Sequence, residues 1–464
     1  DSDGQWGARN PRRGVRWLTW LGVCVWLCSG CGTERVTTTG DAGTGDTGMD
    51  AGDGSVHVDK VDPLLVVDNS GSMAAEQRIL AAAVPDMVER LVDQGLDVRV
   101  GVTTTDAGNS LCGVFGVNNT TPEFGELRAS SCTSRPLEFE WPHSDPTEFA
   151  YDSTCLSVCP ESKGNAWNIT PTAISDDGPA APRPWLEVHP DGSSNVEGTS
   201  WAAALRCMVP QGIDGCGFES QLESQRLAVT KSADPSEPHF GFLRENAMLA
   251  VLHLTDEADC SMNPDLYIYV VENSSFNGEI YYNGDTPTSA LCWNAGTWCT
   301  GSGTPYETCK VANYNYIGQP LSGVYDGDAP DIEQQVLFPL SRFQSQLDAL
   351  PHTPVVAMFA GVPSGYAEGS SEIVYTAAME GSAQWASIGI EYGCTFEADG
   401  VEQNGVPPVR LRDFAAANHA PAVAEATDLP RNIFSICDSD TTDEVDRIAD
   451  LILAGVAQTN INGG

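Results

Sequence analysis

The sequence predicts an α/β fold, with a doubly wound, mostly parallel sheet flanked by helices. Short apolar runs without alternation, such as PLLVV at 63–67 and LAVLHL at 249–254, are typical of strands buried on both faces. Between such runs, apolar residues recur at helical spacing. Strand and helix signals alternate along the chain, which favours parallel strands joined by helical crossovers.

The first half of the fold is expected in the order strand, helix, strand, strand. The strand at 63–67 leads through a turn at 68–72 into a helix. Pro85 lies within that helix and predicts a kink or a second helix. Residues 97–104 alternate in hydrophobicity and predict the next strand, and 185–188 a short third one. The apolar face of the helix is formed by Met73, Leu80, Val84, Met87, Val88 and Leu91.

The second half continues the alternation. Helices are expected at 202–208, 219–229 and 336–350, and strands at 249–254, 355–360 and 432–437. Thr441 and Glu444 have the spacing of a capping box, which predicts the start of a C-terminal helix. Val445, Ile448, Ile452 and Leu453 would form its apolar stripe.

The charge of the chain excludes several classes of partner. Among 464 residues, 64 acidic side chains oppose 23 basic ones, for a formal net charge of −41. Nucleic acids are bound through Lys and Arg, and anionic membrane surfaces attract the same residues. We therefore expect no nucleic-acid partner and no direct membrane binding. With 41% hydrophobic and 19% charged residues, the chain is typical of a globular protein.

The N-terminus is predicted to be an export signal. Four arginines precede an apolar run at 17–27 that is too short to span a bilayer. Ser29 and Gly30 before Cys31 resemble the lipobox of bacterial lipoproteins, which implies acylation of Cys31, although Cys28 stands where that motif usually has Leu. Ordinary cleavage is the alternative. We expect residues 1–31 to be the signal and 32–59 a flexible Gly/Asp/Thr-rich linker. The protein would then be exported and held by a lipid anchor at the outer membrane, in the periplasm or at the cell surface.

Twelve cysteines follow Cys31, and in an exported chain they predict up to six disulfides. None of the twelve forms a Cys-x-x-Cys pair, which disfavours a zinc site. Local pairs are expected between Cys207 and Cys216 and between Cys394 and Cys437. Residues 105–184 and 258–333 hold eight of the twelve, so we interpret them as disulfide-stapled insertions in a domain spanning about 60–460.

The most informative motif is Asp68-Asn69-Ser70-Gly71-Ser72, in the loop after the first buried strand. Ligands bind at the carboxyl ends of the strands in such sheets. Mg²⁺ takes six hard oxygen ligands, and this loop offers a carboxylate and two hydroxyls, leaving positions for water and a partner's oxygen. The alternative is a turn that only caps the following helix.

The motif resembles the metal-ion-dependent adhesion site of von Willebrand factor type A domains. That resemblance implies Mg²⁺, or else Mn²⁺ or Ca²⁺, at Asp68, Ser70 and Ser72. The family places a Thr-Asp pair at the end of its fourth strand, which implies Asp256 as the second carboxylate. An exposed acidic loop is the alternative there.

The family also contributes a threonine from an intermediate loop, and Thr199 is the candidate for it in this chain. If that loop instead lies at 212–219, which has no Thr, Asp214 or Glu219 would have to serve. A carboxylate in this place would weaken the ion's attraction for an acidic partner and favour Ca²⁺. The leader and the cysteine-rich insertions are similar to those of von Willebrand type A lipoproteins of predatory and gliding Gram-negative bacteria.

We therefore predict an exported binding or adhesion protein, not an enzyme. It would capture a protein partner through an acidic side chain at the metal, with specificity set by the insertions. An envelope scaffold in which metal only stabilises the fold is the alternative, and a metal-dependent hydrolase a weaker one. Phosphatases with Asp at a strand end need a second acid two residues later, where this chain has Ser70. His253 is expected to be a hydrogen-bonded core histidine.

Overall fold

A six-stranded sheet forms the centre of the computed structural model, in the order β14-β11-β8-β1-β2-β6. Five strands are parallel, and the edge strand β6 runs antiparallel to β2. The predicted α/β class with a mostly parallel, helix-flanked sheet is confirmed. The strands are β1 (Lys60–Val67), β2 (Asp97–Thr104), β6 (Leu186–Val188), β8 (Ala247–Leu254), β11 (Val355–Ala360) and β14 (Ile433–Ser435).

The structure describes residues 57–112, 121–141, 147–159, 167–174, 178–272, 280–282, 286–321, 334–398 and 400–462. The predicted signal, Cys31 and nearly all of the linker lie outside these residues. Within them, no helix is both long enough and apolar enough to span a membrane.

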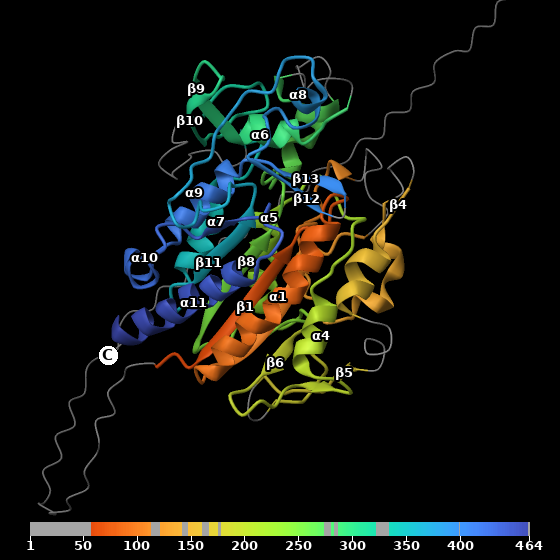
Figure 1. Ribbon diagram of the computed structural model, residues 1–464, viewed down its shortest axis with the longest axis vertical. Helices are drawn as coiled ribbons and strands as arrows, with labels where there is room; N and C mark the ends of the chain where they lie inside the picture. Colours follow the sequence, from red (N-terminus) through yellow and green to blue (C-terminus); the bar gives the residue numbers. More distant parts are fainter. Residues whose placement is uncertain are drawn as a thin grey trace, which may run out of the picture. The chain divides into compact units, whose positions relative to one another are not determined.

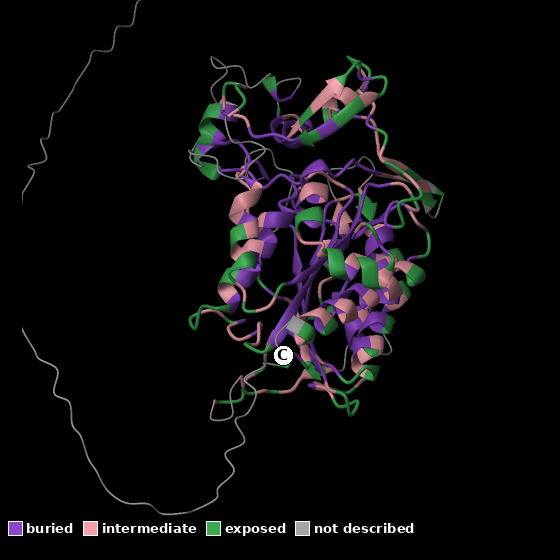
Figure 2. Ribbon diagram, turned by 90° about the vertical axis from the view of Figure 1, so that its left-hand side faces the viewer, coloured by how far each residue is buried: buried purple, intermediate pink, exposed green. Residues whose placement is uncertain are grey.

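Helices cover both faces of the sheet, as expected for a doubly wound arrangement (Figure 1). Leu65 and Val67 of β1 pack in the cluster that includes α1 (Ala74–Asp93), α4 (Trp201–Met208) and α11 (Thr442–Asn462). Leu64 and Val66 pack on the other side with α5 (Gln221–Ser232), α7 (Leu340–Asp348) and α9 (Val409–Ala417). Burial of β1 on both faces explains its continuous apolar sequence, and Figure 2 shows the strands of the sheet buried between the helices.

Most predicted elements lie within about three residues of their observed bounds, and two helices differ in other ways. Helix α1 continues through Pro85, which is buried with its neighbours Val84 and Met87, so the second helix considered for this position does not form. Helix α7 begins later than residue 336, because the backbone before it bonds to other segments: Val336 N donates to Tyr314 O and Phe338 N to Ser261 O.

The predicted capping box of the last helix is wrong. The hydroxyl of Thr441 is buried and has no hydrogen-bond partner among the described residues. Instead, Asp440 accepts hydrogen bonds from the backbone N–H and the hydroxyl of Thr442. The helix still begins at Thr442, with Thr441 O accepting a hydrogen bond from Val445 N, but the side chain that accepts from a backbone N–H of the first turn is that of Asp440.

Three long connections join the sheet strands. The first, between β2 and β6, contains β3 (Glu140–Trp141), β4 (Glu148–Phe149) and β5 (Asn168–Ile169), and β5 pairs with β7 (Val196–Glu197). The second, between β8 and β11, contains α6 (Ala290–Gly296) and the hairpin of β9 (Thr297–Gly301) and β10 (Tyr306–Val311). The third, between β11 and β14, was not singled out in the sequence. It contains α8 (Ala383–Ser387), β12 (Cys394–Ala398), β13 (Val401–Gly405), α9 and α10 (Pro421–Thr427).

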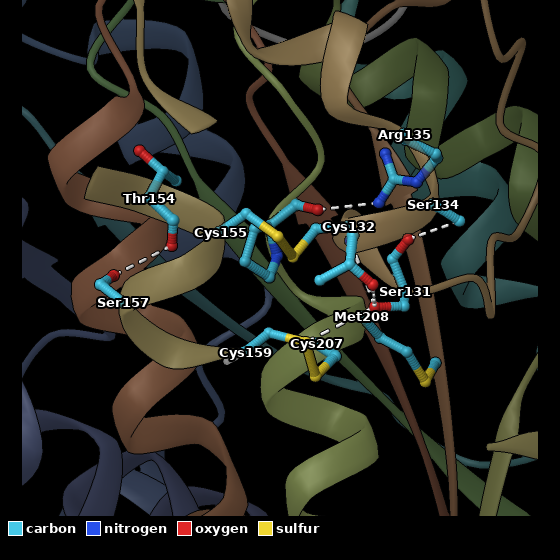
Figure 3. Close-up of a disulfide and its surroundings, with 12 residues drawn as sticks. Ser131, Cys132, Ser134, Arg135, Thr154, Cys155, Ser157, Cys159, Cys207 and Met208 are labelled. Carbon is cyan, nitrogen blue, oxygen red and sulfur yellow. Dashed lines mark hydrogen bonds between the residues drawn. A yellow bond between two sulfur atoms is a disulfide. The ribbon is translucent and has the colours of Figure 1, made fainter. Parts of the chain in front are cut away.

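All twelve cysteines after Cys31 are paired in six disulfides. Cys394–Cys437 is confirmed, whereas the predicted Cys207–Cys216 pair is wrong. Cys207 lies on α4 and pairs with Cys159 of the first connection, while Cys216 lies in the loop beyond that helix and pairs with Cys112. The prediction was based only on their closeness in sequence. Figure 3 shows how two disulfides fasten the first connection to itself and to α4. The pairs are Cys112–Cys216, Cys132–Cys155, Cys159–Cys207, Cys260–Cys292, Cys299–Cys309 and Cys394–Cys437.

The two ends of the described chain are tied together. Val58, just before β1, donates its N–H to Asn460 Oδ1 at 2.7 Å, and Asn460 Nδ2 donates back to Val58 O at 3.1 Å. Both residues lie at the amino end of the parallel strands, away from Asp68 at the carboxyl end of β1.

Candidate metal site

Asp68 is held rigidly at the carboxyl end of β1. Its backbone N–H donates to Leu254 O at 2.9 Å, which continues the pairing of β1 with β8 by one residue. Its Oδ1 accepts from the N–H of Ser70 at 2.9 Å, and its Oδ2 from the hydroxyl of Thr255 at 2.6 Å. The carboxylate is fully buried, so its orientation is fixed by these donors.

The two serines of the motif present their hydroxyls side by side. Ser70 Oγ and Ser72 Oγ are 3.3 Å apart; Ser70 is buried, whereas Ser72 is exposed. The residue that caps α1 is Met73, and no side chain of the described residues accepts a hydrogen bond there. The hydroxyls therefore do not serve as helix caps, which was the alternative interpretation of the motif.

Asp256 follows β8 and lies beside the motif. Burial, followed by the charges of Asp68 and Glu257, raises the pKa of its carboxyl well above the ordinary value, and a hydrogen bond with Ser72 opposes that rise. Its Oδ1 is buried without a hydrogen-bond partner among the described residues. The structure thus brings Asp68, Ser70, Ser72 and Asp256 together.

Thr199 does not join them. Thr199 lies just before α4 and follows a segment that is bonded to β6 through the bridge between Ser194 and Val188. Val188 in turn lies opposite Val98, near the amino end of β2. Because β6 is antiparallel to β2, this segment lies at the end of the sheet opposite Asp68. The far end of α4 leads instead into a loop at 209–220 that reaches the motif, where Gly215 N donates to Asn69 O at 2.8 Å.

Glu219 is the carboxylate that this loop brings to Asp68. Its side chain is 1% exposed; one oxygen accepts a hydrogen bond from the hydroxyl of Thr105, and Oε1 has no partner among the described residues. Burial and the neighbouring charge of Asp68 raise its pKa well above the ordinary value. Asp214 in the same loop is affected by other groups, since burial, Glu138 and Glu123 raise its pKa to about 7. Of the two carboxylates left open by the sequence, Glu219 lies beside Asp68.

Gln77 is a site residue that the sequence analysis missed. It is fully buried in the second turn of α1, where its Nε2 donates to Asp68 O and to Gly212 O, both at 2.7 Å. Its Oε1 accepts from Gln211 N at 2.8 Å. The amide thus braces the motif against the loop that carries Glu219. The sequence did contain an indication of this role, because Gln77 is a polar residue on the otherwise apolar stripe of the helix.

Two aromatic side chains from the connections border the site. The indole of Trp141 lies so close to Gly71 that a Cβ atom there would be 3.0 Å from Cδ2 and Cε2 of the ring. Tyr392, from the third connection, has its pKa raised by burial and next by Glu257, with a further contribution from Asp256. Both side chains are half-buried. Neither residue belongs to a recognisable sequence pattern, so neither could be singled out beforehand.

The donor set fits a hard divalent cation. In the part of the chain that the structure describes, no three His, Cys, Asp or Glu side chains are arranged to hold a metal by themselves. A site of the predicted kind takes two ligands from serine hydroxyls. Here the hydroxyls lie near the buried carboxylates of Asp256 and Glu219, and one oxygen of each carboxylate has no hydrogen-bond partner in the part of the chain that the structure describes. An unpaired buried carboxylate is costly, and a bound cation would compensate it. Oxygen-only ligands suit Mg²⁺, Mn²⁺ or Ca²⁺.

His253 behaves as a core residue. It is fully buried on β8, its Nε2 lies 2.8 Å from Gln225 Oε1, and burial lowers its pKa to about 3. The imidazole is therefore neutral at physiological pH, in agreement with the core interpretation.

No protein-family model matches the chain, and no curated protein matches it either.

Proposed function

We propose that this is an exported binding protein that holds a divalent cation at Asp68, Ser70, Ser72 and Asp256, with Glu219 beside Asp68 adding negative charge, and captures a partner through that cation. The observation that carries the proposal is a pair of buried carboxylate oxygens beside the motif, Asp256 Oδ1 and Glu219 Oε1, which have no hydrogen-bond partner within the described ranges. A bound cation would supply a Lewis-acidic point for a partner's oxygen. Ser72, the exposed member of the set, marks the side from which that oxygen would approach.

The protein's own residues have defined tasks in this proposal. Thr255 orients Asp68, and Gln77 fixes the motif against the loop of Glu219. Glu219 adds negative charge in the place where the type A family uses a threonine hydroxyl. The cation would therefore attract a partner's acidic side chain, the group expected from the resemblance, less strongly, and Ca²⁺ becomes the favoured ion.

An envelope scaffold is the second candidate function. It is favoured by the burial of Asp68, Ser70, Asp256 and Glu219, because a cation enclosed by these groups would stabilise the fold without any partner. The export that both functions require is supported by the six disulfides.

Thermal unfolding of the disulfide-bonded protein in EDTA, Mg²⁺, Mn²⁺ and Ca²⁺ tests the cation site. A cation at one hundred times its Kd adds about 2.7 kcal/mol to the stability of the folded state. Asp68→Ala should abolish this gain, while Asp86→Ala, at an exposed position of the following helix, should keep it. A wild-type protein that melts identically in EDTA and in all three cations would contradict the proposal.

A further inference from the structure

A cavity at the amino end of the sheet is separate from the candidate metal site. It lies where β11 begins, against α10 and the last turns of α11, and has a volume of about 560 Å³. Asp68 follows the carboxyl end of β1, so the two places lie at opposite ends of the parallel strands. A volume of this size is typical of sites for small organic ligands. We propose that the cavity binds an uncharged small molecule that has an apolar body and donates an N–H or O–H group to His419.

The walls of the cavity combine rigid apolar surfaces with a few polar groups. Pro351 and Pro354 flank His352 in the loop before β11, and Pro421 stands at the start of α10. A proline ring fixes the φ angle of its own residue, so these walls lose little conformational freedom when a ligand binds. The prolines therefore form a preorganised surface that suits the apolar body of a ligand.

The charge of the lining indicates an uncharged ligand. Among the described residues that line the cavity, none is Asp, Glu, Lys or Arg, although the chain has 64 acidic and 23 basic residues. A charged ligand would lose part of its hydration there without gaining an ion pair. An anion would in addition be repelled by the net charge of −41.

His419 sets the hydrogen-bonding requirement. Its Nε2 lies 2.8 Å from Leu429 O, and because a carbonyl oxygen only accepts hydrogen bonds, Nε2 carries the proton. In the neutral ring, Nδ1 then has the unshared electron pair, and no described residue donates to it. The bond to Leu429 also fixes the orientation of the imidazole. Since His419 lines the cavity, a ligand there can supply the missing donor.

His352 contributes a second unpaired group. Its Nε2 is buried and has no hydrogen-bond partner within the described ranges. An unpaired buried polar atom is costly, and a ligand that bonded to it would remove that cost. A primary amide has N–H donors and a carbonyl acceptor on one edge, which matches the needs of the two imidazoles.

The test is a titration of the disulfide-bonded protein, followed by saturation-transfer NMR, with four compounds that share one aromatic ring. Benzamide has both the donor and the acceptor, N,N-dimethylbenzamide lacks the N–H, and benzoate and benzylammonium carry opposite charges. We expect saturable binding of benzamide and binding of N,N-dimethylbenzamide that is about fivefold weaker or more. The two ions should bind more weakly than benzamide.

Three variants connect this binding to the cavity. Ala422→Trp places a large side chain at the lining and should abolish benzamide binding. Ala426→Trp is the matched control, because Ala426 is exposed on the same helix and does not line the cavity. His352→Phe should weaken binding about fivefold without lowering the melting temperature, since it removes an unpaired buried nitrogen. Melting curves establish that each variant is folded.

Several results would overturn the inference. Benzamide might be expected to fail in two ways, by not saturating the wild-type protein or by binding equally well to folded Ala422→Trp or His352→Phe, and either result contradicts the site. Benzoate or benzylammonium binding as tightly as benzamide would contradict an uncharged ligand, and N,N-dimethylbenzamide doing so would contradict the role of His419. Titration in EDTA should give the same affinities, because the described residues that line the cavity include none of the candidate metal site. The inference therefore stands or falls independently of the cation.

Discussion

The side-chain amide of Gln77 donates a hydrogen bond to the backbone oxygen of Asp68 from nine residues further along the chain. The same nitrogen also reaches Gly212 O, so one buried amide holds together two loops, the second of them 135 residues from Gln77 in sequence. The geometry of the candidate site therefore depends on a residue that would touch no ligand.

Gln77→Leu should destabilise the protein and weaken cation binding together. The substitution leaves Asp68 O, Gly212 O and Gln211 N without their partner, and each unsatisfied buried group costs about 1–3 kcal/mol. We expect a loss of about 3 kcal/mol in urea unfolding. Gln94→Leu, at the exposed end of the same helix, should change stability by no more than about 0.5 kcal/mol. Equal unfolding free energies for the two variants would show that the brace is unimportant.

Glu219→Thr should change the preference of the site among cations. Removing a carboxylate lowers the negative charge around the ion, and Ca²⁺ depends on that charge more than Mg²⁺ does. We expect Ca²⁺ affinity to fall about tenfold or more, and Mg²⁺ affinity to change less. Thr199→Ala, on the far side of α4, should stay within about twofold of the wild type. Calorimetric titration checks both variants, and weaker binding by Thr199→Ala would mean that our placement of the third ligand is wrong.

Gly71→Ala should displace the indole of Trp141. The added Cβ would lie 3.0 Å from two ring atoms, tighter than nearly all such contacts, so the ring or the loop must give by a few tenths of an ångström. We expect a shift in tryptophan emission and a loss of about 1–3 kcal/mol in stability. Gly217→Ala is the matched control, because a Cβ atom added there would meet no atom within 4 Å and its backbone is not left-handed. Unchanged emission for Gly71→Ala would argue against the close packing.

Glu76 should make the cation-free protein less stable as pH rises. Burial, with a contribution from Asp68, raises its folded-state pKa to about 8, above the ordinary 4.5. Below the ordinary value both states are protonated. At a pH between these two pKa values, the unfolded chain has released the Glu76 proton that the folded chain retains. The free energy of unfolding therefore falls by up to about 1.4 kcal/mol per pH unit. Urea unfolding in EDTA at several pH values should show this slope, and Glu76→Gln should reduce it. A variant with the wild-type slope would exclude Glu76 as its source.

The sequence predicted the sheet well because buried parallel strands have continuous apolar sequences. β2 and β11 have the predicted bounds, and the carboxyl ends of β1 and β8 place Asp68 and Asp256 together. The third ligand depended on which end of α4 reaches the motif. The antiparallel direction of β6 decides which end of α4 lies near Asp68, and a strand of only three residues does not reveal its direction in the sequence. Trp141 was beyond prediction for a different reason, since it arrives from a connection held by disulfides and not by a repeating pattern.

The course of β1 between β2 and β8, from the end where Val58 is bonded to Asn460 to Asp68, has a mechanical consequence. The chain enters the sheet at Val58 and reaches Asp68 along β1 itself, with β2 and β8 bonded along its two sides. Tension between the N-terminal segment and a captured partner would therefore run parallel to β1. Such a pull loads the hydrogen bonds on both sides in shear, all at once, instead of opening them one after another. Under the proposed function, the sheet would thereby resist a pull between the N-terminal segment and a partner held at Asp68.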